Sequence, residues 1–190
     1  MALDRRRTIE TFGDVAIDVT REGGGPVIVL LPSKARDSLD FDAAAEGLAE
    51  RGFRVIRPQP RGALGSRGPL TGLKLHNLAR DVAEVIRAEG GEPAIVVGHA
   101  FGNWVARTLA VMHPELVRGI VLAAAAARSV PAEITATVAA AANTGLDREK
   151  RLAALRLGFF APGNDPSVAR RLARRRQPLP DGRDRGDTAH

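Results

Sequence analysis

Residues 94–104 constrain the fold of this chain more strongly than any other segment. An apolar run of strand length leads into a tight turn with glycine at positions 98 and 102, and a helix-like segment follows directly. A sharp turn between a strand and a helix leaves no room for a Cβ atom on either flank, which explains a glycine at each. The central residue, Ala100, is then held above the end of the sheet. The segment predicts a strand–turn–helix unit within an α/β fold.

The residue at the centre of this turn decides its chemistry. Nucleophile elbows share this layout, and their central side chain, Ser, Cys or Asp, is the attacking group. Ala100 has only a methyl group at that position. The sequence therefore predicts the backbone of a catalytic turn without its reactive atom.

Four further segments occur in the order found in one known family. Residues 26–33 look like a central strand with the loop after it, and residues 53–58 look like the next strand. Residues 61–66 look like the family's Arg-Gly loop, with Gln59 where Asp is usual, and residues 113–122 match the return into a sixth strand. Together with the turn, these segments resemble the α/β-hydrolase superfamily over about residues 8–165.

The resemblance and the residue pattern predict the same fold, a mostly parallel sheet of about six strands with flanking helices. Residues 27–31 are apolar at every position, which is typical of a strand covered on both faces. Residues 11–20 alternate like a half-buried strand, and the turn at 23–26 predicts an antiparallel hairpin between these two runs. Helical spacing and closing glycines predict helices over residues 40–51 and 75–88, and residues 101–112 are expected to form the helix after the turn.

The chain divides into three predicted regions. Residues 1–128 form the hydrolase core, and residues 129–165, with helical stretches at 131–142 and 147–160, resemble part of the family's helical cap. Residues 166–190 form a basic tail that is expected to be disordered. The last two strands of a full α/β hydrolase are missing from the pattern, so we expect a truncated or frame-shifted family member. Asp- and Gly-x-x-His-like segments in the neighbouring reading frames would support that expectation.

Charge and composition exclude several classes of protein. The whole net charge of +6 arises from residue 150 onward, where ten Lys and Arg stand against four Asp, and residues 1–149 are neutral. No aromatic residue interleaves with the arginines of the tail, so nucleic acid is not an expected partner. Cysteine is absent, as are a signal-peptide pattern and an apolar run of membrane length, so we expect a cytoplasmic protein without a membrane partner. No phosphate-loop or metal-ligand pattern occurs, so neither a cofactor nor a metal is expected.

The rest of a catalytic triad is also missing from the sequence. In this family the chain order is nucleophile, acid, histidine. Only two histidines follow the turn in the sequence: His113, at the foot of the adjoining helix, and His190, in the basic tail. The segment after the sixth strand, residues 123–128, is nearly all alanine and offers no acid. We therefore expect no activity by the Ser-His-Asp route.

The groups that would bind a substrate are better preserved. By resemblance, the two backbone N–H donors of the oxyanion hole belong to Phe101 and, with Pro32-Ser33 in place of His-Gly, to Lys34. Ser33 and His99 are further candidates for contact with a ligand. A purely structural role, in loop hydrogen bonding or in packing, is the alternative for both.

Two function classes stay open. The first is an α/β-hydrolase family member, whose intact relatives cleave esters, amides or related bonds of small molecules, but which is itself inactive by the Ser-His-Asp route. The second is a non-catalytic protein that binds a small ligand, or a partner, in a pocket over Ala100. In addition, residues 119–125 are expected to form an unpaired apolar strand edge through which the chain self-associates.

Overall fold

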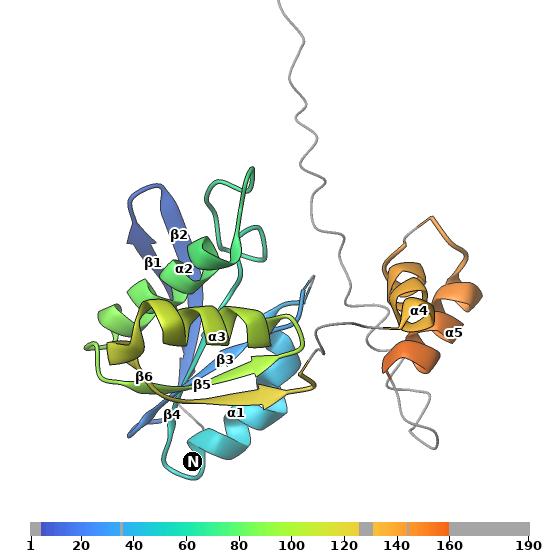
Figure 1. Ribbon diagram of the computed structural model, residues 1–190. Helices are drawn as coiled ribbons and strands as arrows, with labels where there is room; N and C mark the ends of the chain where they lie inside the picture. The colour runs from blue at the N-terminus through green and yellow to red at the C-terminus, as the bar shows by residue number, and fades with distance from the viewer. Residues whose placement is uncertain (1–4, 35, 126–130, 144, 160–190) are drawn as a thin grey trace, which may run out of the picture. The chain divides into compact units, whose positions relative to one another are not determined.

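The structure, a computed structural model, describes residues 5–34, 36–125, 131–143 and 145–159. It consists of two compact units, the first running to Ala125 and the second beginning after it. The first unit is a sheet covered by helices, and the second contains a pair of helices (Figure 1).

The first unit contains a single six-stranded sheet. Its strands are β1 (Arg5–Phe12), β2 (Val15–Glu22), β3 (Val27–Leu31), β4 (Arg54–Pro58), β5 (Ala94–His99) and β6 (Val117–Ala123). Their order across the sheet is β1-β2-β4-β3-β5-β6, in which β4, β3, β5 and β6 are parallel and β1 and β2 are antiparallel to their neighbours. The predicted mostly parallel sheet is confirmed.

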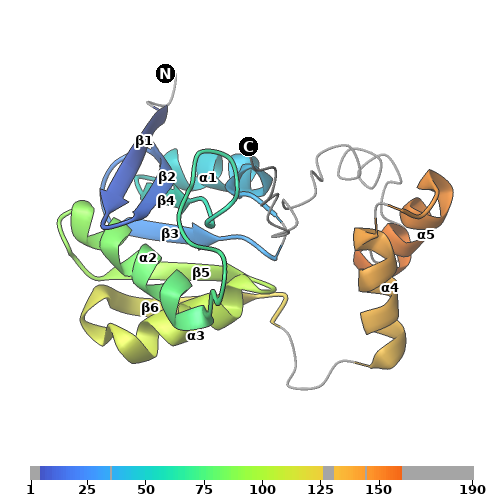
Figure 2. The ribbon, with the colours of Figure 1, turned by 90° about the horizontal axis from the view of Figure 1, so that it is seen from above.

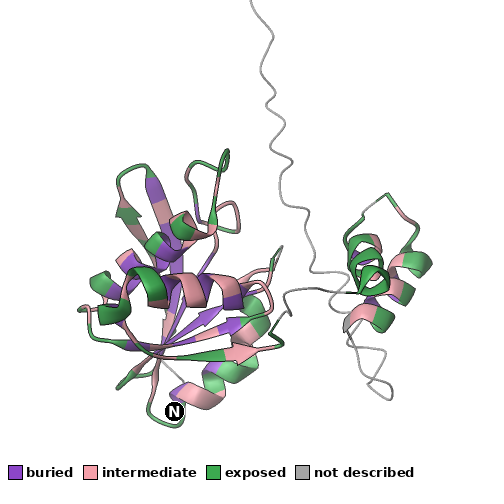
Figure 3. Ribbon diagram, viewed as in Figure 1, coloured by how far each residue is buried: buried purple, intermediate pink, exposed green. Residues whose placement is uncertain are grey.

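Helices cover both faces of this sheet (Figure 2). They are η1 (Ser38–Phe41), α1 (Asp42–Ala49), α2 (Leu75–Ala88), α3 (Gly102–Met112) and η2 (Pro114–Leu116). The larger core contains apolar side chains of α2 and α3 packed on one face of β2, β3, β4 and β5. A smaller core packs α1 on the other face of β3 and β4. Buried residues accordingly concentrate in the strands between the two helical layers (Figure 3).

The predicted hairpin between residues 11–20 and 27–31 is wrong. The chain turns at Gly13, which has a φ of 60°, so the alternating run is divided between β1 and β2. These two strands pair with each other, with Arg5 opposite Glu22 at one end and Phe12 opposite Val15 at the other. On its other edge β2 pairs with β4 instead of β3. The regular alternation of Val15, Ile17 and Val19 belongs to β2 alone, and Phe12, the cross-strand partner of Val15, is one position out of phase with it. The hairpin therefore lies about ten residues earlier than the pattern indicates.

The second unit contains α4 (Ala132–Ala142) and α5 (Arg148–Phe159), which agree with the two helical stretches expected there. Ala141, Leu152 and Leu155 form its small buried core. The predicted domain limits at residues 128 and 165 and the predicted disorder of 166–190 lie outside the described residues and stay predictions. None of the described helices combines the length and the apolar character that a membrane span requires.

Charged side chains are buried where β2 and β4 meet α1. The side chain of Arg57 has no exposed surface; it binds Glu22, the carbonyl oxygen of Ser38 at 2.9 Å and the carboxylate of Asp42 at 2.6 Å. Arg5 brings a second guanidinium to Glu22 at 2.8 Å. Removing one partner of such a buried pair typically costs about 3–5 kcal/mol, because the other charge is left uncompensated. The network therefore ties the antiparallel strands to the parallel part of the sheet and to the start of α1.

The last strand in the sheet order is β6. Among the described residues no strand pairs with its outer edge. Two of its apolar side chains are exposed, Ile120 by 38% and Val121 by 49%. An exposed apolar strand edge is a template for pairing with another chain.

We propose that the chain self-associates through β6. Val121→Lys should weaken association at least tenfold, because a charge on an edge strand opposes edge-to-edge pairing. Sedimentation equilibrium measures the dissociation constant, and Val111→Lys, at an exposed valine of α3, is the matched control. A protein that stays monomeric at high concentration, or an equal effect of both substitutions, would contradict the proposal.

Candidate functional site

The turn between β5 and α3 has the sharp geometry expected from the sequence. Ala100 lies between the end of β5 and the start of α3 with a φ of 48°. A residue with a Cβ atom costs about 1–2 kcal/mol in this left-handed region, so the surrounding structure must hold it there. The Ala100 N–H donates to the carbonyl oxygen of Ala123 at 3.0 Å, and its own carbonyl oxygen accepts from Asn103 N–H at 3.1 Å.

Two glycines allow the backbone to fold this tightly. A Cβ atom on Gly98 would lie 2.7 Å from the backbone nitrogen of Asn103. A Cβ atom on Gly102 would lie 3.0 Å from the carbonyl oxygen of Pro32. The first turn of α3 therefore presses directly against the ends of β5 and β3, as close backbone approach requires.

The same close approach brings the loop after β3 beside the turn. Ser33 is half-buried there and accepts a hydrogen bond from the Arg36 N–H at 3.1 Å through its carbonyl oxygen, whereas Lys34 is exposed. Within the described ranges, the Phe101 N–H has no backbone partner. It lies at the N-terminus of α3, where helix N–H groups and the helix dipole favour negative charge. The end of β3 and Pro32 thus lie against the start of α3, and the roles predicted for Ser33, Lys34 and Phe101 stay predictions.

His99 lies on the α1 side of the sheet, away from α3. Its ring meets the ring of Phe41 edge-on at a centroid distance of 6.4 Å and an angle of 87°. His99 is exposed overall, yet partial burial of its imidazole ring lowers the pKa of that ring. The Arg36 guanidinium lowers this pKa further, and the Asp40 carboxylate opposes both effects. The packing interpretation of His99 therefore has direct support in the contact with Phe41.

Asn103 is a residue that the sequence prediction missed. It is only 1% exposed, and its side-chain nitrogen donates to the carbonyl oxygen of Ala123 at 3.1 Å. That oxygen also accepts the Ala100 N–H, so two groups of the turn hold the end of β6. Among the described atoms, the side-chain oxygen of Asn103 has no hydrogen-bond partner. The available signal was a polar residue next to Gly102 in an otherwise apolar first turn of the helix.

His113 lies at the opposite end of α3 from the turn. This residue follows the last residue of α3, so the eleven-residue helix separates it from Ala100 by about 16 Å. Its ring contacts Arg87 at 3.3 Å. His190 lies outside the described residues. No group of three or more possible metal ligands occurs in the described part of the chain.

Gln59, at the position where the family usually has Asp, takes part in a buried network. Its side-chain oxygen accepts the Ser38 N–H at 3.0 Å, and its carbonyl oxygen accepts the Ser66 hydroxyl at 2.9 Å. Farther along, Arg61 binds Asp81 through two hydrogen bonds of 2.7 Å. Burial raises the pKa of Asp81, and the bond to Arg61 partly offsets this effect. The Arg-Gly loop is therefore anchored at both ends by polar contacts.

The chain is similar to known protein families and to curated proteins. A family model described as alpha/beta hydrolase fold matches residues 26–188. The chain is 32% identical over 110 residues to a 2-(acetamidomethylene)succinate hydrolase of Mesorhizobium japonicum, covering 58% of this chain and 39% of that protein. It is 31% identical over 136 residues to epoxide hydrolase A of Mycobacterium tuberculosis, covering 70% and 40%. The chain thus spans about 40% of the length of these curated relatives.

Solved structures show the same fold. A hydrolase from Pseudomonas aeruginosa superimposes with a TM-score of 0.69 at 26% identity, covering 88% of this chain and 65% of that one. An epoxide hydrolase from Vigna radiata superimposes with a TM-score of 0.56 at 22% identity, covering 63% and 39%.

The close approach at the turn gives a prediction about stability. Gly98→Ala and Gly102→Ala should each destabilise the protein by about 1–3 kcal/mol or more, because the added Cβ atoms meet rigid backbone. Ala100→Gly should change stability by about 1 kcal/mol or less, since relief of the left-handed strain offsets the added freedom of the unfolded chain. Urea unfolding measures all three, and Gly24→Ala, whose Cβ would meet nothing within 4 Å, is the control. Glycine variants as stable as the control would show that the turn is less tightly packed than described.

The environment of His99 gives a prediction about pH. Because its folded pKa is lowered, the unfolded chain takes up the proton first, so the associated stability is present above the unfolded pKa of about 6.5 and is lost as the pH falls toward the folded pKa. Arg36→Gln should raise the pKa of His99, and Asp40→Asn should lower it further. An NMR titration of the His99 ring, with the His76 ring as internal reference, measures both changes. Shifts of the opposite sign would refute the assigned electrostatics.

Proposed function

The chain belongs to the α/β-hydrolase fold family, and we propose that it does not catalyse hydrolysis by the Ser-His-Asp route. The observation that carries this proposal is Ala100 itself. Its backbone has the left-handed conformation of a sharp strand-to-helix turn, yet its side chain is a methyl group with no lone pair for attack on a carbonyl carbon.

The size of the expected rate loss supports inactivity. Loss of a serine nucleophile lowers the rate by about 10⁶ in a serine protease. An oxyanion-hole donor such as the Phe101 N–H contributes about 10²–10³ in working hydrolases, but only when a nucleophile forms the tetrahedral intermediate that it stabilises. The preserved donors therefore do not compensate for the missing oxygen.

The preserved donors favour binding of a small ligand over Ala100 as a second function. The Phe101 N–H at the start of α3 suits an oxygen acceptor on a ligand, and the Ser33 hydroxyl, in the loop that follows Pro32 beside Gly102, is a second possible donor. Relatives of the chain are named as an epoxide hydrolase and as a 2-(acetamidomethylene)succinate hydrolase. We therefore propose small molecules with an epoxide, ester or amide oxygen as the ligand class.

Turnover assays test the first proposal. The purified full chain should hydrolyse neither p-nitrophenyl acetate nor styrene oxide above background, and a fluorophosphonate probe should not label it. Ala100→Ser should also stay inactive, because His113 lies about 16 Å away along α3 and His99 packs on the α1 side. Hydrolysis or stoichiometric labelling of the unmodified chain would overturn the proposal.

Binding of the same two probes tests the second proposal. Saturable NMR shifts of the Phe101 and Ser33 amides are expected on titration with styrene oxide or p-nitrophenyl acetate. Ala100→Leu should abolish them by filling the space over the turn, and Val111→Leu, on the exposed part of α3, should leave them unchanged. Absent or non-saturable shifts would reject ligand binding and leave the first proposal intact.

A further inference from the structure

Three consecutive arginines begin β1, and their side chains alternate between the faces of the sheet. Arg5 contacts Glu22 at 2.8 Å, and Arg7 binds Asp18 at 2.6 Å, on the α1 face. Arg6 lies on the other face, directly opposite Arg21 of β2. Like charges directly opposite each other on antiparallel strands are destabilising unless a counter-charge is supplied.

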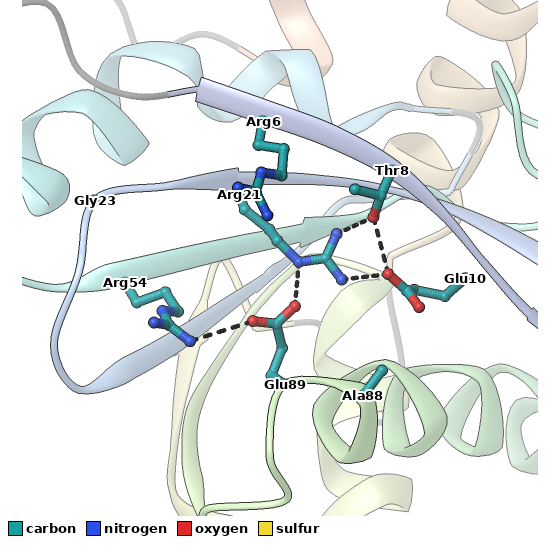
Figure 4. A pocket seen from close by; sticks show the side chains of 8 residues that line it. All are labelled: Arg6, Thr8, Glu10, Arg21, Gly23, Arg54, Ala88 and Glu89. Carbon is teal, nitrogen blue, oxygen red and sulfur yellow. Dashed lines mark hydrogen bonds and ion pairs between the residues drawn. The ribbon is translucent and has the colours of Figure 1, made fainter.

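Arg6 and Arg21 open onto a cavity of about 400 Å³ (Figure 4). The charged and polar side chains that line it are Arg6, Thr8, Glu10, Arg21, Arg54 and Glu89. Three arginines against two glutamates leave one positive charge in excess. A cavity of this volume is in the range that accommodates a small organic molecule.

The two glutamates of this cavity are already occupied. Arg21 binds Glu10 at 2.7 Å and also binds Glu89. The second oxygen of Glu89 is 3.5 Å from Arg54. As Figure 4 shows, these contacts converge on Arg21 and leave Arg6 outside the network.

Two guanidinium groups therefore retain free donors. Arg6 has no acidic partner among the described residues, and Arg54, whose side chain is 43% exposed, has only the single contact to Glu89. A guanidinium group presents five N–H donors in a planar fork that matches a carboxylate or phosphate group. The unused N–H donors of these two arginines therefore suit one bound anion that accepts hydrogen bonds from both.

The cavity is separate from the turn at Ala100. Arg54 is the first residue of β4, and Glu89 caps the C-terminus of α2. Ala100 follows the last residue of β5, and β5 and β4 are both parallel to β3. The two sites therefore lie at opposite ends of the parallel strands, and this inference does not depend on the proposed function.

We propose that this cavity binds a small organic molecule through one oxyanion group, a carboxylate or a phosphate, with Arg6 as the principal ligand and Arg54 as the second. The bound anion supplies the counter-charge that Arg6 lacks and separates it electrostatically from Arg21. Arginine–oxyanion pairs are charge-assisted and often bidentate, which gives the site its selectivity for a planar or tetrahedral oxyanion over chloride.

NMR titrations of the full chain at low ionic strength, with benzoate and inorganic phosphate as separate probes, test this proposal. Saturable shifts are expected at the amides of Gly23 and Ala88, which line the cavity. Stronger binding of benzoate would identify a carboxylate ligand, and stronger binding of phosphate would identify a phosphate ligand. Sodium chloride at equal ionic strength should not reproduce the shifts.

Substitutions complete the test. Arg6→Gln should weaken binding at least about tenfold and Arg54→Gln to a smaller extent, whereas Arg118→Gln, at an exposed arginine of β6, should have no effect. Arg6 is exposed, so its substitution should leave the fold intact, and an unchanged unfolding midpoint checks this. Non-saturable shifts with both probes, or equal losses in Arg6→Gln and Arg118→Gln, would overturn the proposal.

Discussion

The close contact of backbone on backbone at Gly98 and Gly102 is the constraint on which the rest of the first unit depends. It brings the first turn of α3 against the ends of β5 and β3, at a separation that a Cβ atom would prevent. From that contact follow the left-handed conformation of Ala100 and the position of the Phe101 N–H beside the loop of Ser33. The hydrogen bonds from Ala100 and Asn103 to Ala123 extend the same constraint to β6.

The opposite, antiparallel part of the sheet is held together by a different kind of interaction. There the buried Arg57 pairs with the buried Glu22 and with Asp42, whose side chain is 40% exposed, and Arg5 and Arg7 of β1 bind carboxylates of β2. The pairing within this network is incomplete, since Glu22 Oε2 and Arg57 Nε have no partner in the described part of the chain. Pairing offsets the cost of burying charges only in good geometry, so these contacts matter chiefly because the loss of one partner leaves the other charge uncompensated. The parallel part of the sheet depends instead on apolar packing against α1, α2 and α3.

The sequence pattern was sufficient to predict those parts of the fold where a run of residues can form only one kind of structure. The fully apolar run of β3, the periodic face of α2 and the glycines beside Ala100 each had a single structural solution, and the structure contains it. The β1–β2 hairpin was missed because a single apolar residue of β1, Phe12, marks the change of phase at Gly13, and the regular alternation of Val15, Ile17 and Val19 lies wholly within β2. The positions of His99 and Asn103 depend on which element packs against them, and the ion pairs of the three arginines depend on strand register. Neither property is encoded in local spacing, so sequence reasoning could name Ser33, Lys34 and Phe101 only by resemblance.

The left-handed backbone at Ala100 has an evolutionary consequence. The conformation is imposed from outside, by neighbouring glycines and by the end of β6, and the Ala100 side chain makes no contribution to it. The fold therefore does not depend on which side chain stands at position 100. A protein lineage can lose or regain the attacking atom there without a change in the surrounding backbone. Inert and reactive descendants of one ancestor would then be expected to share a superimposable main chain at this turn, whichever side chain stands at its apex.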